Sequence, residues 1–96
     1  MKVVWTYLAV GNLIEANRYI AKENPDAARS VINDIYEAGN RIKEFPEKGR
    51  IVPEIGKHNV REVFCLNYRI IYKMESKRIT ILTVRHMRQD TKKKDI

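Results

Sequence analysis

The sequence contains very little cysteine and no long apolar run, and each absence excludes a class of protein. Cys65 is the one cysteine of the 96 residues, so an internal disulfide and a cysteine-based zinc site are both excluded. No apolar stretch approaches the roughly 20 residues that cross a bilayer. Residues 1–10 lack the long apolar core and small-residue cleavage site of a secretion signal. We therefore expect a cytoplasmic protein with no metal, no cofactor and no membrane contact.

The whole chain has the size of one domain with a modest core. Acidic residues are scarce in its second half. Residues 1–47 contain six Lys/Arg and seven Asp/Glu, a net charge of −1, whereas residues 48–96 contain thirteen and five, a net charge of +8. The whole formal charge of +7 therefore comes from the second half. Such an asymmetry favours a polyanionic partner, and a solvated basic surface is the alternative interpretation.

Two helices are predicted in the first half of the chain. After a short β-branched strand, apolar residues recur at helical spacing over residues 7–22, behind Thr6 as N-cap. Asn24-Pro25-Asp26 ends this helix and starts a second, since it offers an N-cap, a proline for the first helical position and an acid for the positive end of the dipole. The second helix is predicted to run to Phe45, with apolar residues three and four apart. The short connection predicts an antiparallel helical hairpin.

The second half of the chain is predicted to form a sheet. Residues 46–59 hold two prolines, two glycines and no periodicity, so they read as a long loop of functional interest. Three strand-like segments with short turns follow up to residue 85 and predict an antiparallel meander. The order β-α-α-β-β-β indicates an α+β fold, with a helical hairpin on one face of a small, mainly antiparallel sheet and the other face free to bind. We assign residues 1–90 to the domain and 91–96 to a basic tail.

Short sequence words in this order resemble the RelE/ParE toxin superfamily of type II toxin–antitoxin systems, with the ParE branch as the closer match. Together they span residues 3–90, nearly the whole chain. The words are Trp5-Thr6, Tyr19-Ile20-Ala21, Asn24-Pro25-Asp26-Ala27-Ala28, Phe45-Pro46-Glu47-Lys48-Gly49-Arg50, Val52-Pro53-Glu54, Val60-Arg61-Glu62, Asn67-Tyr68-Arg69-Ile70-Ile71-Tyr72 and Val84-Arg85-His86-Met87-Arg88-Gln89-Asp90.

The resemblance implies a growth-inhibiting toxin with a cognate antitoxin, whose amphipathic and often acidic segment wraps the toxin. Two activities occur on this fold. RelE-like members cut mRNA in the ribosomal A site, whereas ParE-like members poison DNA gyrase by binding and need no catalytic residue. The basic second half would attract an acidic wrapping segment in a salt-dependent manner.

Metal-free RNA cleavage needs a base for the 2′-hydroxyl, cations for the phosphorane and an acid for the leaving oxygen. By resemblance to the YoeB-like set, the candidates are Glu54 as base, Arg61 and Arg69 as phosphate clamps, and His86 as acid. Strand alternation places Arg69 on the face opposite Tyr68. Arg69 is thus either a phosphate ligand on the open face or an arginine paired with Glu54 or Glu62. His86 is either an acid or a structural residue at the end of a strand.

The sequence also departs from the nuclease pattern. RelE-type nucleases carry a tyrosine near the C-terminus, whereas residues 87–96 contain no aromatic residue, and without one a base is hard to orient for cleavage. The Asn-Pro helix start and the Val-x-His-x-Arg-Gln-Asp ending resemble the ParE branch, so we favour the gyrase inhibitor over the ribosome-dependent endoribonuclease. The residues expected to bind target or nucleic acid are Arg50, Arg61, Arg69, Arg85, Arg88, Lys92, Lys93 and Lys94.

Overall fold

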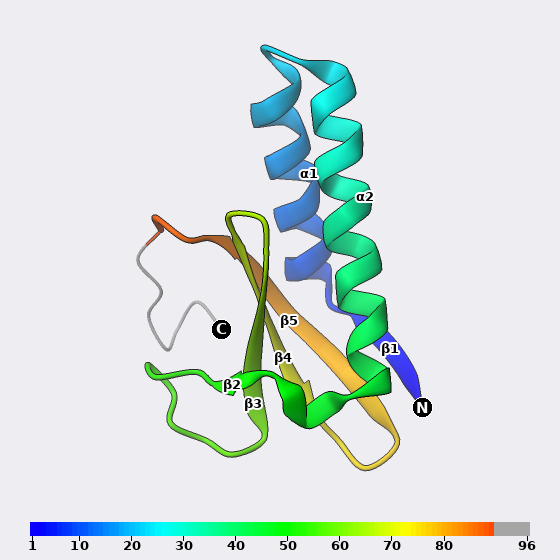
Figure 1. Ribbon diagram of the computed structural model, residues 1–96, viewed down its shortest axis with the longest axis vertical. Coiled ribbons are helices and arrows are strands. Elements are labelled where there is room, and N and C mark those ends of the chain that lie inside the picture. The colour runs from blue at the N-terminus through cyan, green and yellow to red at the C-terminus, as the bar shows by residue number, and fades with distance from the viewer. Residues whose placement is uncertain (90–96) are drawn as a thin grey trace.

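The computed structural model describes residues 1–89 as two helices and a five-stranded sheet (Figure 1). Lys92, Lys93 and Lys94, with the rest of the predicted tail, lie outside the described residues. The elements are β1 (Lys2–Trp5), α1 (Tyr7–Ala21), α2 (Pro25–Arg41), two 3₁₀ turns η1 (Ile42–Glu44) and η2 (Pro46–Lys48), β2 (Arg50–Ile51), β3 (Val60–Cys65), β4 (Tyr68–Met74) and β5 (Arg78–His86).

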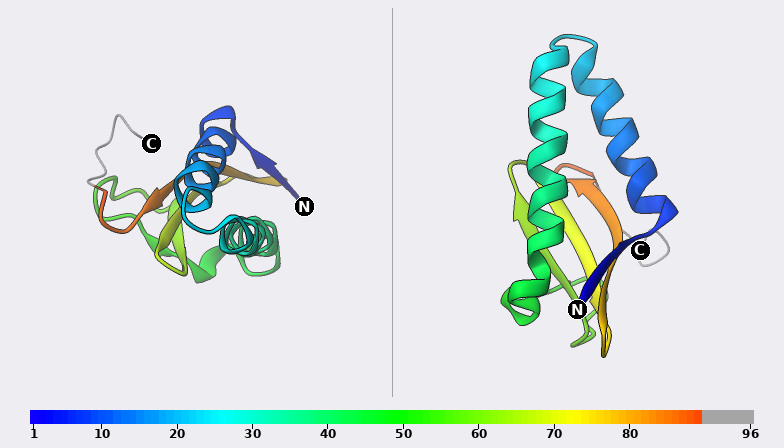
Figure 2. Two further views of the ribbon diagram at one scale, coloured as in Figure 1. Left: turned by 90° about the horizontal axis from the view of Figure 1, so that it is seen from above. Right: turned by 90° about the vertical axis from the view of Figure 1, so that its right-hand side faces the viewer.

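The sheet has the strand order β1-β5-β4-β3-β2, and the predicted α+β fold is confirmed. Strands β2 to β5 pair antiparallel, and short turns join β3 to β4 and β4 to β5. Strand β1 pairs parallel to β5, with the helical hairpin as the connection between this edge and the rest of the sheet. The hairpin projects beyond one end of the sheet, as Figure 1 and the right-hand view of Figure 2 show.

Both helices begin where the sequence predicts. The Thr6 hydroxyl accepts a hydrogen bond from the backbone N–H of Ala9, and the Asn24 side chain accepts one from Ala27. The second helix ends earlier than predicted, because the chain tightens from α to 3₁₀ geometry at Ile42. Neither helix among residues 1–89 has the length and apolar character needed to cross a membrane.

The main core lies between the hairpin and one face of the sheet. Its buried centre comes from the helical stripes and the inward positions of β4 and β5, and includes Leu13, Ile35, Ile70, Tyr72 and Ile81. Phe45, predicted to close the second helical stripe, is instead 69% exposed, because the helix has already ended.

The opposite face of the sheet is not fully open, which corrects the prediction. The segment after β2 folds over it and buries a second small cluster of Val52, Val60 and Ile71. The predicted loop 46–59 therefore contains a 3₁₀ turn and a two-residue edge strand. Its apolar residues form a plug over one end of this face.

Candidate functional site

The four candidate catalytic residues do not meet on one face of the sheet. His86 pairs with Tyr68 in register, and their rings make an edge contact with centroids 5.2 Å apart. Tyr68 packs against the main core, on the helix side. Arg69, the next residue, points to the other face and reaches Glu54. Glu54 and Arg69 therefore lie on one side of the sheet and His86 on the other.

Arg69 is buried in an ion-pair network rather than presented on an open surface. It is only 9% exposed. Its Nε donates to Glu62 at 2.7 Å, and its two terminal nitrogens donate to the two oxygens of Glu54 at 2.9 and 3.0 Å. Glu62 is fully buried and also accepts a hydrogen bond from Arg50. The interpretation of Arg69 as an ion-pair partner is confirmed. Arg69 lies on the predicted face of the sheet, but that face is not open around its side chain.

This network shifts the ionisation of both partners. The hydrogen bonds from Arg69 lower the pKa of Glu54 below its ordinary value of 4.5, against a smaller opposing effect of burial. The same hydrogen bonds to Glu54, followed by those to Glu62, raise the pKa of Arg69. Glu54 is therefore a firmly ionised anchor that ties the segment after β2 to the sheet.

The hydrogen bonds of Arg61 hold neighbouring backbone segments together. Its guanidinium donates to the backbone carbonyls of His58 at 2.8 Å, Glu47 at 3.1 Å and Gly49 at 2.9 Å. It also lies 3.2 Å from the His58 ring nitrogen Nδ1. Most of its donors are thus committed to holding the turn before β2 against the start of β3.

His86 closes the last strand through local hydrogen bonds. Its Nδ1 accepts from the backbone N–H of Arg88 at 3.1 Å, and its own backbone N–H donates to the Gln89 side chain at 2.8 Å. In the neutral ring the proton must then lie on Nε2. The structural interpretation of His86 is the one these contacts favour.

Among the predicted binding residues, Arg50 and Arg88 are exposed, whereas Arg85 is half-buried. Arg85 lies beside Arg69 in the pairing of β5 with β4, so the two share a face of the sheet. Arg50 lies over the ring of Phe64, with its guanidinium carbon 5.3 Å from the ring centroid. Phe64 is 47% exposed and was missed by the sequence analysis, because alternation alone does not tell which apolar strand residue lies uncovered.

The outer surface of α1 is unusually apolar. Beside the buried Leu13, the helix leaves Leu8, Val10 and Ile14 exposed to solvent. Val10 and Ile14 line a groove of about 640 Å³ between the two helices, with Tyr36 on the far side. An apolar surface beside a groove is typical of a site that a partner covers.

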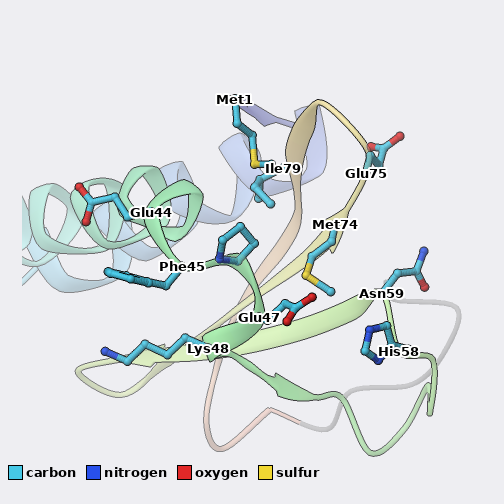
Figure 3. Close-up of a pocket in the computed structure, with 11 residues that line it drawn as sticks. Met1, Glu44, Phe45, Glu47, Lys48, His58, Asn59, Met74, Glu75 and Ile79 are labelled. Carbon is cyan, nitrogen blue, oxygen red and sulfur yellow. The ribbon is translucent and has the colours of Figure 1, made fainter.

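A second groove, of about 870 Å³, lies at the end of the sheet near the chain start (Figure 3). Met1, Phe45 and Met74 give it an apolar lining, to which Glu44, Glu47 and Glu75 add carboxylates. None of the four candidate catalytic residues lines it. It is therefore formed by residues other than those that the sequence predicts for the site, although Arg61 contacts two of its lining residues, Glu47 and His58.

Comparisons with known proteins agree with this architecture. A family model described as the ParE toxin of the type II toxin–antitoxin system ParDE matches residues 3–91. The chain is similar to Y4kP of Sinorhizobium fredii, named as a candidate toxin, with 37% identity over 90 residues that cover 92% of this chain and 90% of the relative. It is also similar to toxin RelE2 of Caulobacter vibrioides, with 29% identity over 86 residues that cover 88% and 93%.

Two solved structures share the fold. A chain from the chromosomal ParDE system of Pseudomonas aeruginosa (P. aeruginosa) matches with a TM-score of 0.73 and 21% identity over 90% of this chain and 95% of that chain. A chain from the RelBE2 toxin–antitoxin complex of Mycobacterium tuberculosis matches with a TM-score of 0.54 and 18% identity over 88% and 95%. At these identities the likeness concerns the fold alone.

Proposed function

Since the chain belongs to the ParE toxin family of type II toxin–antitoxin systems, we propose that it inhibits growth by binding and poisoning DNA gyrase. The observation that carries the proposal is the division of the candidate catalytic residues between two faces of the sheet. A gyrase inhibitor acts by binding and does not need these four residues to meet at one catalytic site.

The contacts of each candidate support binding over cleavage. Glu54 has a lowered pKa, which makes it a weaker proton acceptor for a 2′-hydroxyl. Arg69 already holds two carboxylates, and Arg61 holds three backbone carbonyls, so neither offers a full set of donors to a phosphate. A ribosome-dependent endoribonuclease would have to take this network apart before it could act.

The proposal includes a cognate antitoxin that covers the apolar side of the helical hairpin. The groove between α1 and α2, with Val10, Ile14 and Tyr36 along it, suits the apolar stripe of an amphipathic segment. Acidic residues of that segment would then meet the basic second half of the chain. Ile14→Glu is expected to weaken binding to the product of the neighbouring gene at least tenfold while gyrase inhibition is kept.

A supercoiling assay tests the choice between the two activities. Purified toxin is expected to block supercoiling of relaxed plasmid by gyrase or to trap cleaved DNA, while mRNA in programmed ribosomes stays intact. His86→Ala, a change at a half-exposed position, is expected to inhibit as the wild type does. Normal supercoiling at saturating toxin, together with cleavage in the A site that His86→Ala abolishes, would establish the endoribonuclease instead.

A further inference from the structure

An aromatic side chain and an arginine form an exposed pair on the sheet face opposite the helices. Phe64 lies between Val63 and Cys65, which pack against the main core, so its ring points to the other face. The ring is 47% exposed, and the plug of Val52 and neighbouring residues covers only the other end of this face. An open aromatic ring therefore remains beside the buried ion-pair network.

Arg50 is held in a fixed position next to this ring. Its Nε donates to the carboxylate of Glu62, which is fully buried, and its guanidinium lies over Phe64. Its side chain is still 59% exposed, and within residues 1–89 its two terminal nitrogens have no hydrogen-bond partner. These nitrogens are preoriented donors for an anion directly beside a planar apolar surface.

The surroundings of the pair favour an anionic ligand. In the strand pairing, Phe64 lies opposite Arg69, and Arg69 lies opposite Arg85. Three arginines, Arg50, Arg69 and Arg85, therefore lie on this face of the sheet, where Glu62 pairs with Arg50 and Arg69, and Glu54 pairs with Arg69. The open donors of Arg50 lie on the same side of the sheet as the exposed ring.

We propose that Phe64 and Arg50 form a nucleotide site for a single-stranded nucleic acid. A base stacks on the exposed part of the Phe64 ring, and the neighbouring phosphate accepts hydrogen bonds from the terminal nitrogens of Arg50. An acidic peptide would use the guanidinium but gain nothing specific from the ring, whereas an unpaired nucleotide uses both. The site goes beyond gyrase inhibition and does not depend on it.

Binding to fluorescent oligonucleotides tests this site. Oligo-dT and oligo-U of about 12 nucleotides are expected to bind more tightly than a duplex of the same length, because bases inside a duplex cannot stack on the ring. Phe64→Ala is expected to weaken single-strand binding at least about fivefold. Arg50→Ala is expected to weaken single-strand binding as well. It is also expected to lower the slope of log binding constant against log salt concentration by about one, the amount for one phosphate contact. Comparison of the two oligonucleotides shows whether the strand is DNA or RNA.

Phe45→Ala is the matched control, since Phe45 is also an exposed phenylalanine but lies in the separate groove. It is expected to leave binding unchanged. Phe64→Trp adds a second tryptophan beside Trp5 and is expected to keep binding, with quenching of the new indole by a stacked base. This variant reports on the site even if Phe64→Ala fails to fold.

Three results would each refute the site. In the first, Phe64→Ala binds the single strand as tightly as the wild type does. In the second, the duplex binds as tightly as the single strand. In the third, the oligonucleotide does not quench the fluorescence of the indole in Phe64→Trp. A polyglutamate peptide could also displace the strand and bind Phe64→Ala as tightly as the wild type. That result would assign the surface to acidic peptides. The supercoiling assay is separate, so loss of this site would leave the gyrase proposal standing.

Discussion

Replacement of Arg69 by methionine is expected to lower the free energy of unfolding by about 3 kcal/mol, at the lower end of the 3–5 kcal/mol typical of a broken buried ion pair. The reason is Glu62, whose side chain is fully buried and would lose one of its two arginine partners. Arg50 would remain, but it is 59% exposed and compensates only in part. A small domain is stable by about 5–15 kcal/mol, so the change removes a large share.

Urea denaturation followed by circular dichroism measures this effect. Arg78→Met is the matched control, because the ion pair of Arg78 with Glu75 lies at the surface, where water and salt weaken such pairs. A second change, Glu62→Leu in the Arg69→Met background, is expected to restore most of the loss. It replaces a buried carboxylate that has lost one of its two arginine partners by an apolar contact beside Ile71.

The result that refutes this reasoning is specific. If Arg69→Met costs no more than Arg78→Met, Arg69 does not support the fold through its carboxylates. If the double variant is less stable than the single one, Glu62 is not the source of the loss. The outcome also decides how toxicity data are read, because an inactive but unfolded Arg69 variant says nothing about catalysis.

Three further changes test other parts of the structure. Gly39→Ala is expected to destabilise the fold by about 1–3 kcal/mol and to shift the fluorescence of Trp5, because the new Cβ would lie 2.5 Å from the indole. Tyr72→Phe is expected to cost about 1–3 kcal/mol in thermal or urea denaturation, because the buried hydroxyl donates to the carbonyl of Pro46 at 2.6 Å. Glu54→Gln is expected to lower the free energy of unfolding at neutral pH. It is also expected to make the further loss of stability in acid smaller than in the wild type. The ionised form of Glu54 stabilises the fold above its unfolded pKa near 4.5, and that contribution disappears as the pH falls through the lower folded pKa.

Each of these tests has a control or an opposing result. Gly11→Ala places its Cβ in open space and should not destabilise α1. Unchanged stability in Tyr72→Phe would mean that the hydroxyl does not hold the turn before β2. Glu15→Gln, at an exposed pair with Arg18, is the matched control for the change of carboxylate to amide. A Glu54→Gln profile parallel to that of the wild type below pH 4.5 would show that Glu54 is not an ionised anchor.

The sequence by itself determined where the two helices begin, the strands β1 and β3 to β5, and the family. Helix starts at Thr6 and Asn24 depend on local hydrogen bonds, and the helical and alternating apolar patterns depend on neighbours a few residues apart. Strand alternation also places Arg69 and Tyr68 on opposite faces, as the structure confirms. These features are local in the chain, and a single sequence is enough to predict them.

Only the tertiary structure decided what each candidate side chain contacts. The sequence cannot tell that the segment after β2 folds back over the sheet, because its apolar plug is Val52 against the distant Ile71. That fold buries Arg69 between two carboxylates, and the strand register places His86 on the opposite face of the sheet. It also leaves Phe64 and Arg50 uncovered. Burial and pairing across the chain arise from packing between segments, and so no local pattern encodes them.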